Sequence, residues 1–205
     1  MLDKEGFNGW ADKYDETVDG SMASGTYPFC GYDDVHRAVF ELIKNSSRVL
    51  DLGIGTARLT KRLYDLGIEI TGVDFSESML AAAREKLPRA TLVLADLSEP
   101  TALDGITGGF DAIVALYSIH HLTDARKVEL INGAKRLLTR GGVFVIGDVA
   151  FADAAERESC VRAAGDEFDF DEYYCVADKL APLIDGKTEF RKISFCAGVL
   201  TVRFD

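Results

Sequence analysis

The sequence has little cysteine, and none of it lies in a pattern that would hold a metal or a disulfide framework. Cys30, Cys160, Cys175 and Cys196 are far apart, with no C-x-x-C pair and no His/Cys ligand spacing. Isolated cysteines of this kind are typical of free thiols in a reducing compartment. We therefore expect a cytoplasmic protein without disulfides.

Long apolar runs are also absent. No stretch reaches the ~20 apolar residues that a transmembrane helix needs. The acidic N-terminus, MLDKEGFNGWADKYDE, lacks the apolar segment of a secretory signal. We expect no membrane partner and no signal peptide.

Positive charge is in deficit, since 34 Asp and Glu residues against 23 Lys and Arg give a net charge of −11. Affinity for nucleic acids rests on Lys and Arg that neutralise phosphates, and the sequence has no cluster of basic residues. The composition therefore disfavours a nucleic-acid partner, and it leaves the oligomeric state open. A length of 205 residues suits one domain with small lids.

What the sequence does contain is an alternation of short apolar segments with helical ones. The apolar segments are rich in Val, Ile, Leu and Phe and nearly continuous, as expected of parallel strands buried on both faces. They span residues 48–53, 69–75, 90–96, 110–118 and 142–151, and the helical stretches between them span 57–66, 76–86 and 125–138.

This alternation predicts an α/β fold with a doubly wound, mostly parallel sheet of seven strands. The last two strands come from residues 188–204, which we expect to form an antiparallel hairpin joined at Ala197-Gly198. Further helices are expected over residues 9–18, 32–44, 153–164 and 171–184.

A glycine-rich turn, Asp51-Leu52-Gly53-Ile54-Gly55, falls where the first strand meets the first helix. Glycines there allow a tight turn and the close approach of a ligand. Arg58 occupies the position of the third glycine of a dinucleotide-binding G-x-G-x-x-G, which argues against a pyrophosphate at the helix start. The carboxylate of Asp51 would likewise repel a diphosphate, but it suits a ligand with ammonium and sulfonium charge.

Acidic residues also close the next two strands, Asp74 the second and Asp96 the third. An Asp at the end of the second strand can accept hydrogen bonds from both ribose hydroxyls, and one after the third can accept from an adenine amino group. Three acids and a glycine turn in these positions favour a ligand that carries both adenosine and positive charge.

The chain resembles class I S-adenosylmethionine-dependent methyltransferases in five motifs: D-L-G-I-G-T, G-V-D-F-S-E-S-M-L, A-D-L, F-D-A-I-V-A-L-Y-S-I-H-H-L and L-L-T-R-G-G-V-F-V-I. W-A-D-K-Y-D and Y-S-I-H-H-L-T-D are further similar to small bacterial methyltransferases of unassigned substrate. The resemblance implies a Rossmann-like methyltransferase fold, S-adenosyl-L-methionine as cofactor and S-adenosyl-L-homocysteine as product.

The resemblance also implies that nine residues bind the cofactor: Tyr14, Asp51, Gly53, Gly55, Asp74, Phe75, Met79, Asp96 and Leu97. Asp74 would take the ribose hydroxyls, and Asp96 and Leu97 would bind the edge of the adenine. Other roles stay open for three of the nine, namely Asp51 as a turn-stabilising carboxylate, Phe75 as a core aromatic and Met79 as a core helix residue.

The end of the fourth strand carries Tyr117, His120 and His121, which should lie near the transferred methyl group. Tyr117 is a candidate to hydrogen-bond the substrate or cofactor, and His121 is a candidate general base near neutral pH. His120 is expected to be structural, and Asp148, at the end of the fifth strand, either faces the substrate or packs. Two adjacent histidines with no third His or Cys close by favour the absence of a metal site.

Two segments are candidates for covering the substrate, residues 1–46 as an N-terminal helical lid and 152–174 as an insertion in a core domain of 47–205. The run 166–174 mixes acids with aromatics, which either binds a cationic acceptor or forms a solvated acidic turn. No N/D-P-P-Y/F signature of amino-group methylation follows the fourth strand, which argues against that branch. Trp10, Tyr14, Tyr27 and Tyr32 are the lid aromatics that precede the core.

Two other functions compete with methyl transfer to a small molecule. One is a sensor or interaction protein that binds S-adenosylmethionine without turnover, because a fold does not fix a function. The other is a nucleotide-cofactor oxidoreductase, which Asp51 and Arg58 disfavour. The complete cofactor motifs and the short chain favour the enzyme.

Overall fold

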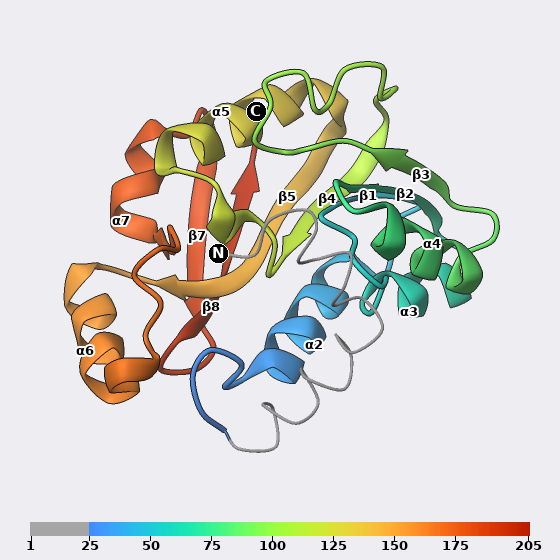
Figure 1. The fold of residues 1–205 in the computed structure, drawn as a ribbon. Coiled ribbons are helices and arrows are strands. Elements are labelled where there is room, and N and C mark those ends of the chain that lie inside the picture. Colours follow the sequence, from blue (N-terminus) through green and yellow to red (C-terminus); the bar gives the residue numbers. More distant parts are fainter. Residues whose placement is uncertain (1–24) are drawn as a thin grey trace.

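The computed structural model describes residues 25–205, and these residues form one mixed sheet with helices on both faces (Figure 1). Seven strands follow the order β3-β2-β1-β4-β5-β8-β7, and a two-residue strand, β6, pairs with the end of β5. β1 to β5 are parallel, and β8 runs antiparallel to both of its neighbours. The strands are β1 Arg48–Leu52, β2 Glu69–Asp74, β3 Thr91–Leu94, β4 Phe110–Leu116, β5 Leu138–Phe151, β6 Cys175–Val176, β7 Lys187–Lys192 and β8 Ala197–Arg203.

The sheet carries a separate hydrophobic core on each face. Successive residues of β1 face opposite sides of the sheet. Val49 belongs to the buried cluster that contains Val35 and Val39 of α2 (Tyr32–Ile43), whereas Leu50 belongs to the cluster that contains Leu130 of α5 (Asp124–Ala134). Both sets are buried, which explains why the strand sequences are apolar without alternation. The predicted doubly wound α/β fold with a seven-stranded, mostly parallel sheet is confirmed.

The helices are α2 Tyr32–Ile43, α3 Thr60–Asp65, α4 Glu77–Lys86, α5 Asp124–Ala134, α6 Ala154–Ala164 and α7 Ala177–Leu180.

Short polar side chains begin three of these helices. Ser76 accepts a hydrogen bond from the Met79 amide at 3.3 Å, as Thr123 does from the Arg126 amide. The Asp153 carboxylate caps α6 in the same way. N-caps of this kind satisfy amides that have no partner within the helix.

Two sequence-based expectations about the C-terminal part are wrong. The helix predicted over residues 171–184 is replaced by β6, the short α7 and a 3₁₀ turn, because β6 continues the sheet from β5. The hairpin turns at residues 193–196, and Ala197-Gly198 opens β8 instead. The Ser194 hydroxyl fixes this turn by accepting from the Ala197 amide at 3.0 Å. The helix predicted over residues 9–18 lies outside the described residues.

The described residues have no disulfide, and Cys30, Cys160, Cys175 and Cys196 are free thiols. Within residues 25–205, no helix has the length and apolar character needed to cross a bilayer.

Candidate functional site

A cavity of about 550 Å³ opens at the carboxyl ends of β1, β2 and β4. In open α/β sheets this edge is where ligands bind. Its walls come from α2, the turn after β1, the end of β2, the segment after β3 and the turn after β4. All predicted cofactor residues of the described chain, and both predicted catalytic residues, line it: Asp51, Gly53, Gly55, Asp74, Phe75, Met79, Asp96, Leu97, Tyr117 and His121. Tyr14 and Trp10 lie outside the described residues.

The glycine turn is held by backbone hydrogen bonds to the neighbouring strand. The amides of Gly53 and Ile54 both donate to the Val73 carbonyl, at 2.7 and 3.0 Å. Gly53 adopts a left-handed backbone with φ of 77°, and a Cβ on it would overlap the Cβ of Ser118. Only glycine therefore fits at this point.

Asp74 organises the same turn with both carboxylate oxygens. Oδ2 accepts from the Gly55 amide at 2.8 Å, and Oδ1 accepts from the Ser76 amide at 2.9 Å. Burial raises the pKa of Asp74, and the hydrogen bonds from these amides oppose that rise. The carboxylate also faces the cavity, so that it links the turn to any ligand bound there.

Asp51 is 4% exposed and accepts a hydrogen bond from the Thr60 hydroxyl. Burial raises the pKa of Asp51 to about 7, against the lowering effect of the Thr60 hydrogen bond and with a further rise from the charge of Asp74. Because Asp51 both anchors the start of α3 and lines the cavity, its two predicted roles are compatible.

Phe75, Met79, Asp96 and Leu97 line the part of the cavity to which the resemblance assigns the adenine. Met79 is 3% exposed, and Leu97 is 8% exposed. The Asp96 carboxylate is exposed and accepts from the Ser98 amide at 2.8 Å, which fixes the turn after β3. Phe75 follows the end of β2 and faces the cavity beside them.

Tyr117 sits at the other end of the cavity in a strained conformation. Its φ of 47° lies in the left-handed region, which costs a non-glycine residue about 1–3 kcal/mol. The ring packs against Tyr32 of α2, with centroids 4.7 Å apart, and against Phe29. Strain at a cavity wall is typical of residues placed for function.

Two cavity residues with basic side chains were not predicted as site residues. His36 lies one helical turn after Tyr32, and its Nε2 is buried without a hydrogen-bond partner among the described residues. Burial, together with the charges of Arg58 and Arg62, lowers the pKa of His36 to about 4, so the ring is neutral. Arg58, noted in the sequence only for the glycine it replaces, also lines the cavity. The sequence signal that could have found His36 is its position four residues after Tyr32, which places both side chains on one face of the same helix.

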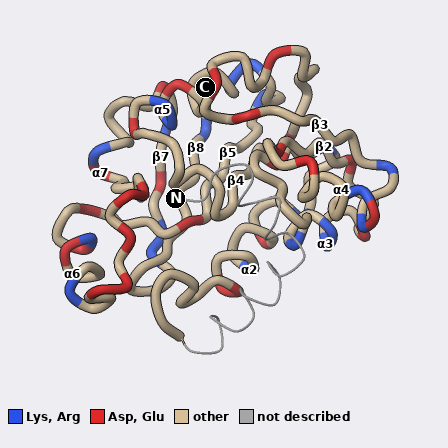
Figure 2. Tube along the Cα trace, viewed as in Figure 1, with Lys and Arg blue, Asp and Glu red and all other residues tan. Residues whose placement is uncertain are grey.

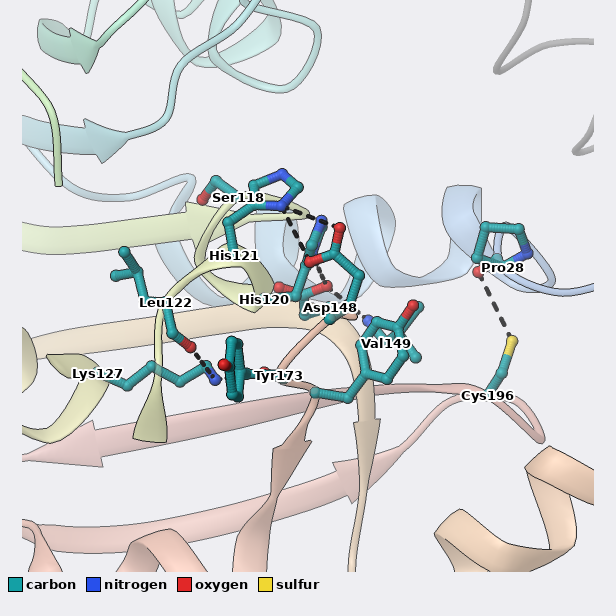
Figure 3. A network of polar contacts seen from close by, with 12 residues as sticks. Pro28, Ser118, His120, His121, Leu122, Lys127, Asp148, Val149, Tyr173 and Cys196 are labelled. Atoms are coloured by element: carbon teal, nitrogen blue, oxygen red, sulfur yellow. Dashed lines mark hydrogen bonds and ion pairs between the residues drawn. The ribbon is translucent and has the colours of Figure 1, made fainter. Parts of the chain in front are cut away.

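The two histidines after β4 have different surroundings (Figure 3). His120 Nδ1 lies 2.7 Å from a carboxylate oxygen of Asp148, which is fully buried in β5. Burial lowers the pKa of His120, but the charge and hydrogen bond of Asp148 outweigh it and raise this pKa overall. His121 Nδ1 lies 3.0 and 3.1 Å from the two carboxylate oxygens of Glu172. Glu172 was missed because it is distant in sequence.

The acidic and aromatic run 166–174 is packed against other segments by specific contacts. The Tyr173 amide donates to the His120 carbonyl at 2.8 Å, and the Tyr174 hydroxyl is hydrogen-bonded to that of Tyr27. The Asp169 amide also donates to the Tyr27 hydroxyl at 3.1 Å. These contacts bring the two predicted lid segments together beside the cavity end that holds His121.

Comparisons with known proteins agree with this geometry. A family described as "Methyltransferase domain" matches residues 49–142. An uncharacterized methyltransferase of Geobacillus thermodenitrificans (strain NG80-2) is 37% identical over 187 residues, covering 86% of this chain and 84% of that protein. Another, from Geobacillus kaustophilus (strain HTA426), is 37% identical over 186 residues with the same coverage. The chain belongs to the class I S-adenosylmethionine-dependent methyltransferases.

Solved structures show that the methyltransferase shares its fold with more distant proteins. The CcbJ methyltransferase from Streptomyces caelestis is 20% identical, with a TM-score of 0.70 and 99% of each chain covered. DhpI in complex with SAH is also 20% identical, with a TM-score of 0.69, covering 98% of this chain and 94% of that one. The cofactor of the methyltransferase is S-adenosylmethionine.

The cavity fits this cofactor in size and in chemistry. Its volume of about 550 Å³ falls within the usual range for small-molecule sites. Three carboxylates, Asp51, Asp74 and Asp96, line it at the ends of successive strands and suit an ammonium, a ribose and an adenine amino group. When bound, the cofactor supplies a methyl group activated by a positively charged sulfur.

Proposed function

We propose that the methyltransferase transfers a methyl group to a small molecule that binds in the same cavity as the cofactor. The observation that carries this proposal is the continuity of the cavity. Acids and a glycine turn line one part of it, and Tyr32, Tyr117 and His121 line the part beyond them. Transfer requires mainly that donor and acceptor be held close together in line, and one shared cavity can hold both.

The cofactor end of the cavity is assigned residue by residue. Asp51 holds the ammonium group, and the backbone at Gly53 and Gly55 lies along the methionine part. Asp74 accepts from the ribose hydroxyls while it holds the turn. Phe75 and Met79 pack on the adenine, and Asp96 with Leu97 binds its edge. The assignment is supported by the position of all these residues around one cavity.

The acceptor end is assigned to Tyr117 and His121, with the two lid segments around them. Residues 152–174 place Glu172 against His121, and the Tyr27–Tyr174 contact joins this segment to the chain before α2. Phe170 and Tyr173 remain 68% and 47% exposed, so that they are free to contact a bound acceptor. We assign Tyr14 to the part of the N-terminal lid that covers the cofactor.

The distribution of charge supports a small molecule over a nucleic acid as acceptor. Lys and Arg are scattered over α3, α4, α5, α6 and α7, where Asp and Glu accompany them (Figure 2). With a net charge of −11, the chain offers no basic stripe along the described trace to follow a phosphate backbone.

Turnover of the radiolabelled cofactor with a panel of small metabolites tests the proposal, and calorimetry with S-adenosylhomocysteine measures cofactor binding separately. We expect tight binding and transfer to at least one member of the panel. Tight binding without transfer across a broad panel would favour a sensor. Binding of NADH in place of S-adenosylhomocysteine would reject the cofactor assignment itself.

A further inference from the structure

Four ionisable side chains from three distant parts of the chain meet beside the acceptor end of the cavity. His120 and His121 are adjacent in the 3₁₀ turn Ile119–His121, Asp148 comes from β5, and Glu172 comes from the segment before β6. One ligand-type atom from each of His120, His121 and Glu172 lies within 4.8 Å of the other two. The third ligand that the sequence lacks near its two histidines is thus supplied by the fold.

The backbone on both sides of this cluster is fixed. The amide of Tyr173, next to Glu172, donates to the carbonyl of His120 at 2.8 Å. The buried ammonium of Lys127 donates to the carbonyls of Tyr173 and Leu122 (Figure 3). Its charge is matched by Asp124, 3.2 Å away. Lys127 therefore holds the backbone next to the cluster in place, and Asp124 balances its charge.

Both carboxylates of the cluster are largely shielded from solvent. The side chains of Asp148 and Glu172 are 0% and 9% exposed, and buried carboxylates are costly unless they are paired. One oxygen of Asp148 is, moreover, buried without a hydrogen-bond partner in the described structure. A divalent ion held by the two histidines and Glu172 would place positive charge beside both carboxylates.

We propose that His120, His121 and Glu172 bind a divalent first-row transition metal ion, with zinc as the first candidate. Two imidazoles and one carboxylate form a ligand set that zinc and similar ions prefer and that magnesium and calcium do not. Asp148 holds Nδ1 of His120, which leaves Nε2 for the ion, and such a carboxylate–histidine pair is a common support for metal ligands. Tetrahedral zinc ligands lie about 3.4 Å apart, so ligand atoms that already lie within 4.8 Å of one another need only small side-chain adjustments to bind one ion.

The site would leave one coordination position open toward the cavity that His121 lines. An acceptor hydroxyl or thiol that takes this position gives up its proton to water near neutral pH, because a divalent ion stabilises the resulting anion. The electron pair on that oxygen or sulfur then forms the new bond to the methyl carbon, and the pair of the broken carbon–sulfur bond stays with the donor sulfur. The acceptor class is therefore an alcohol or a thiol. This consequence rests on the proposed function, whereas the ion site does not.

Metal binding is tested on the full chain, without cofactor or acceptor. The protein is stripped with a chelator, dialysed and titrated with zinc and with cobalt. We expect one equivalent of either ion, visible cobalt absorption of a nitrogen–oxygen site, and no sulfur-to-cobalt charge transfer. Glu172→Gln and His121→Gln should each weaken zinc affinity by at least about 100-fold, and Asp148→Asn by about 10- to 100-fold.

Glu167→Gln is the matched control, because Glu167 is an exposed acid on the same segment. It should leave zinc affinity within twofold of the parent. S-adenosylhomocysteine affinity of each variant reports whether the fold is intact. The proposal is overturned if the stripped protein takes up less than a tenth of an equivalent, if both ligand variants bind as the parent does, or if the cobalt spectrum shows thiolate ligation. Methyl transfer by the fully stripped enzyme would reject the role of the ion in deprotonating the acceptor, while leaving the proposed function standing.

Discussion

The two ends of the cavity are built by different means. The cofactor end comes from residues 51–97, and its geometry is set by backbone hydrogen bonds, such as those from the Gly53 and Ile54 amides to Val73. The acceptor end joins side chains from α2, the turn after β4 and the segment before β6, with His121 and Glu172 separated by 51 positions. We therefore expect substitutions at the cofactor end to disrupt its backbone geometry. At the acceptor end, where side chains come from separate segments, single residues can be replaced without moving the others.

The largest expected effect is at the backbone-built end. Gly53→Ala should abolish measurable binding of S-adenosylhomocysteine, because its Cβ would overlap Ser118 and force the turn out of place. Gly67→Ala is the control, since Gly67 also has a positive φ, 85°, but has nothing within 4 Å of an added Cβ. The control should lose only about 1–2 kcal/mol of stability and keep its affinity. Calorimetry of both variants checks this, and normal binding by Gly53→Ala would contradict it.

Asp74→Ala should weaken cofactor binding by at least about tenfold, because it removes the proposed ribose acceptor together with the partner of the Gly55 amide. Asp65→Ala, at an exposed acid paired with Lys61 on α3, should leave affinity unchanged. Titration calorimetry with S-adenosylhomocysteine measures both. An unchanged affinity in Asp74→Ala would refute the ribose assignment.

Affinity should also depend on pH through Asp51. With a pKa of about 7 in the free protein, this carboxyl must lose its proton before it can pair with an ammonium group. Binding of S-adenosylhomocysteine should therefore tighten by about tenfold from pH 6 to pH 8 and level off above that. Asp51→Asn should bind weakly with a much flatter profile, and an equal slope in this variant would assign the dependence to another group.

The raised pKa of Asp51 also predicts how the free energy of unfolding changes with pH. The folded-state pKa of Asp51 lies above its ordinary value of 3.8, so the folded protein holds this proton more tightly than the unfolded chain. The contribution is stabilising at low pH and is lost as the pH rises from about 4 to 7. Denaturant unfolding of the free protein at several pH values checks the slope, which Asp51→Asn should reduce.

The smallest expected effect tests whether the cofactor end and the acceptor end of the cavity are independent of each other. Glu172→Gln should change S-adenosylhomocysteine affinity by less than about twofold, because Glu172 contacts His121 and does not line the wall assigned to the cofactor. A tenfold loss would mean that the two ends are coupled and that the acceptor end is not an independent module.

The sequence predicted the parts of this protein that depend on neighbours along the chain. Continuous apolar strands such as 110–116 are recognisable because both of their faces are buried, and the cofactor end is recognisable because its turn and acids follow successive strands. The N-cap at Thr123 is equally local.

What the sequence could not show depends on distant partners. The pairing of His120 with Asp148 and of His121 with Glu172 exists only because β5 and the segment before β6 return to the turn after β4. The prediction of no metal site depended on the spacing of histidine and cysteine in the sequence, which does not show which distant segments meet in the fold. The helix predicted over 171–184 was wrong for the same reason, since pairing of β6 with β5 overrides the local helical pattern.

The contact between Gly53 and Ser118 also limits how such an enzyme can be redesigned. Since a Cβ added to Gly53 would overlap the Cβ of Ser118, position 53 must stay glycine in any variant that is to keep its cofactor. Under the proposed assignment, new acceptors would be accommodated at Tyr32, at Tyr117 or along residues 165–174. A mutant library that varies those positions and keeps Gly53 and Ser118 constant would explore acceptor choice without spending diversity on proteins that no longer bind the methyl donor.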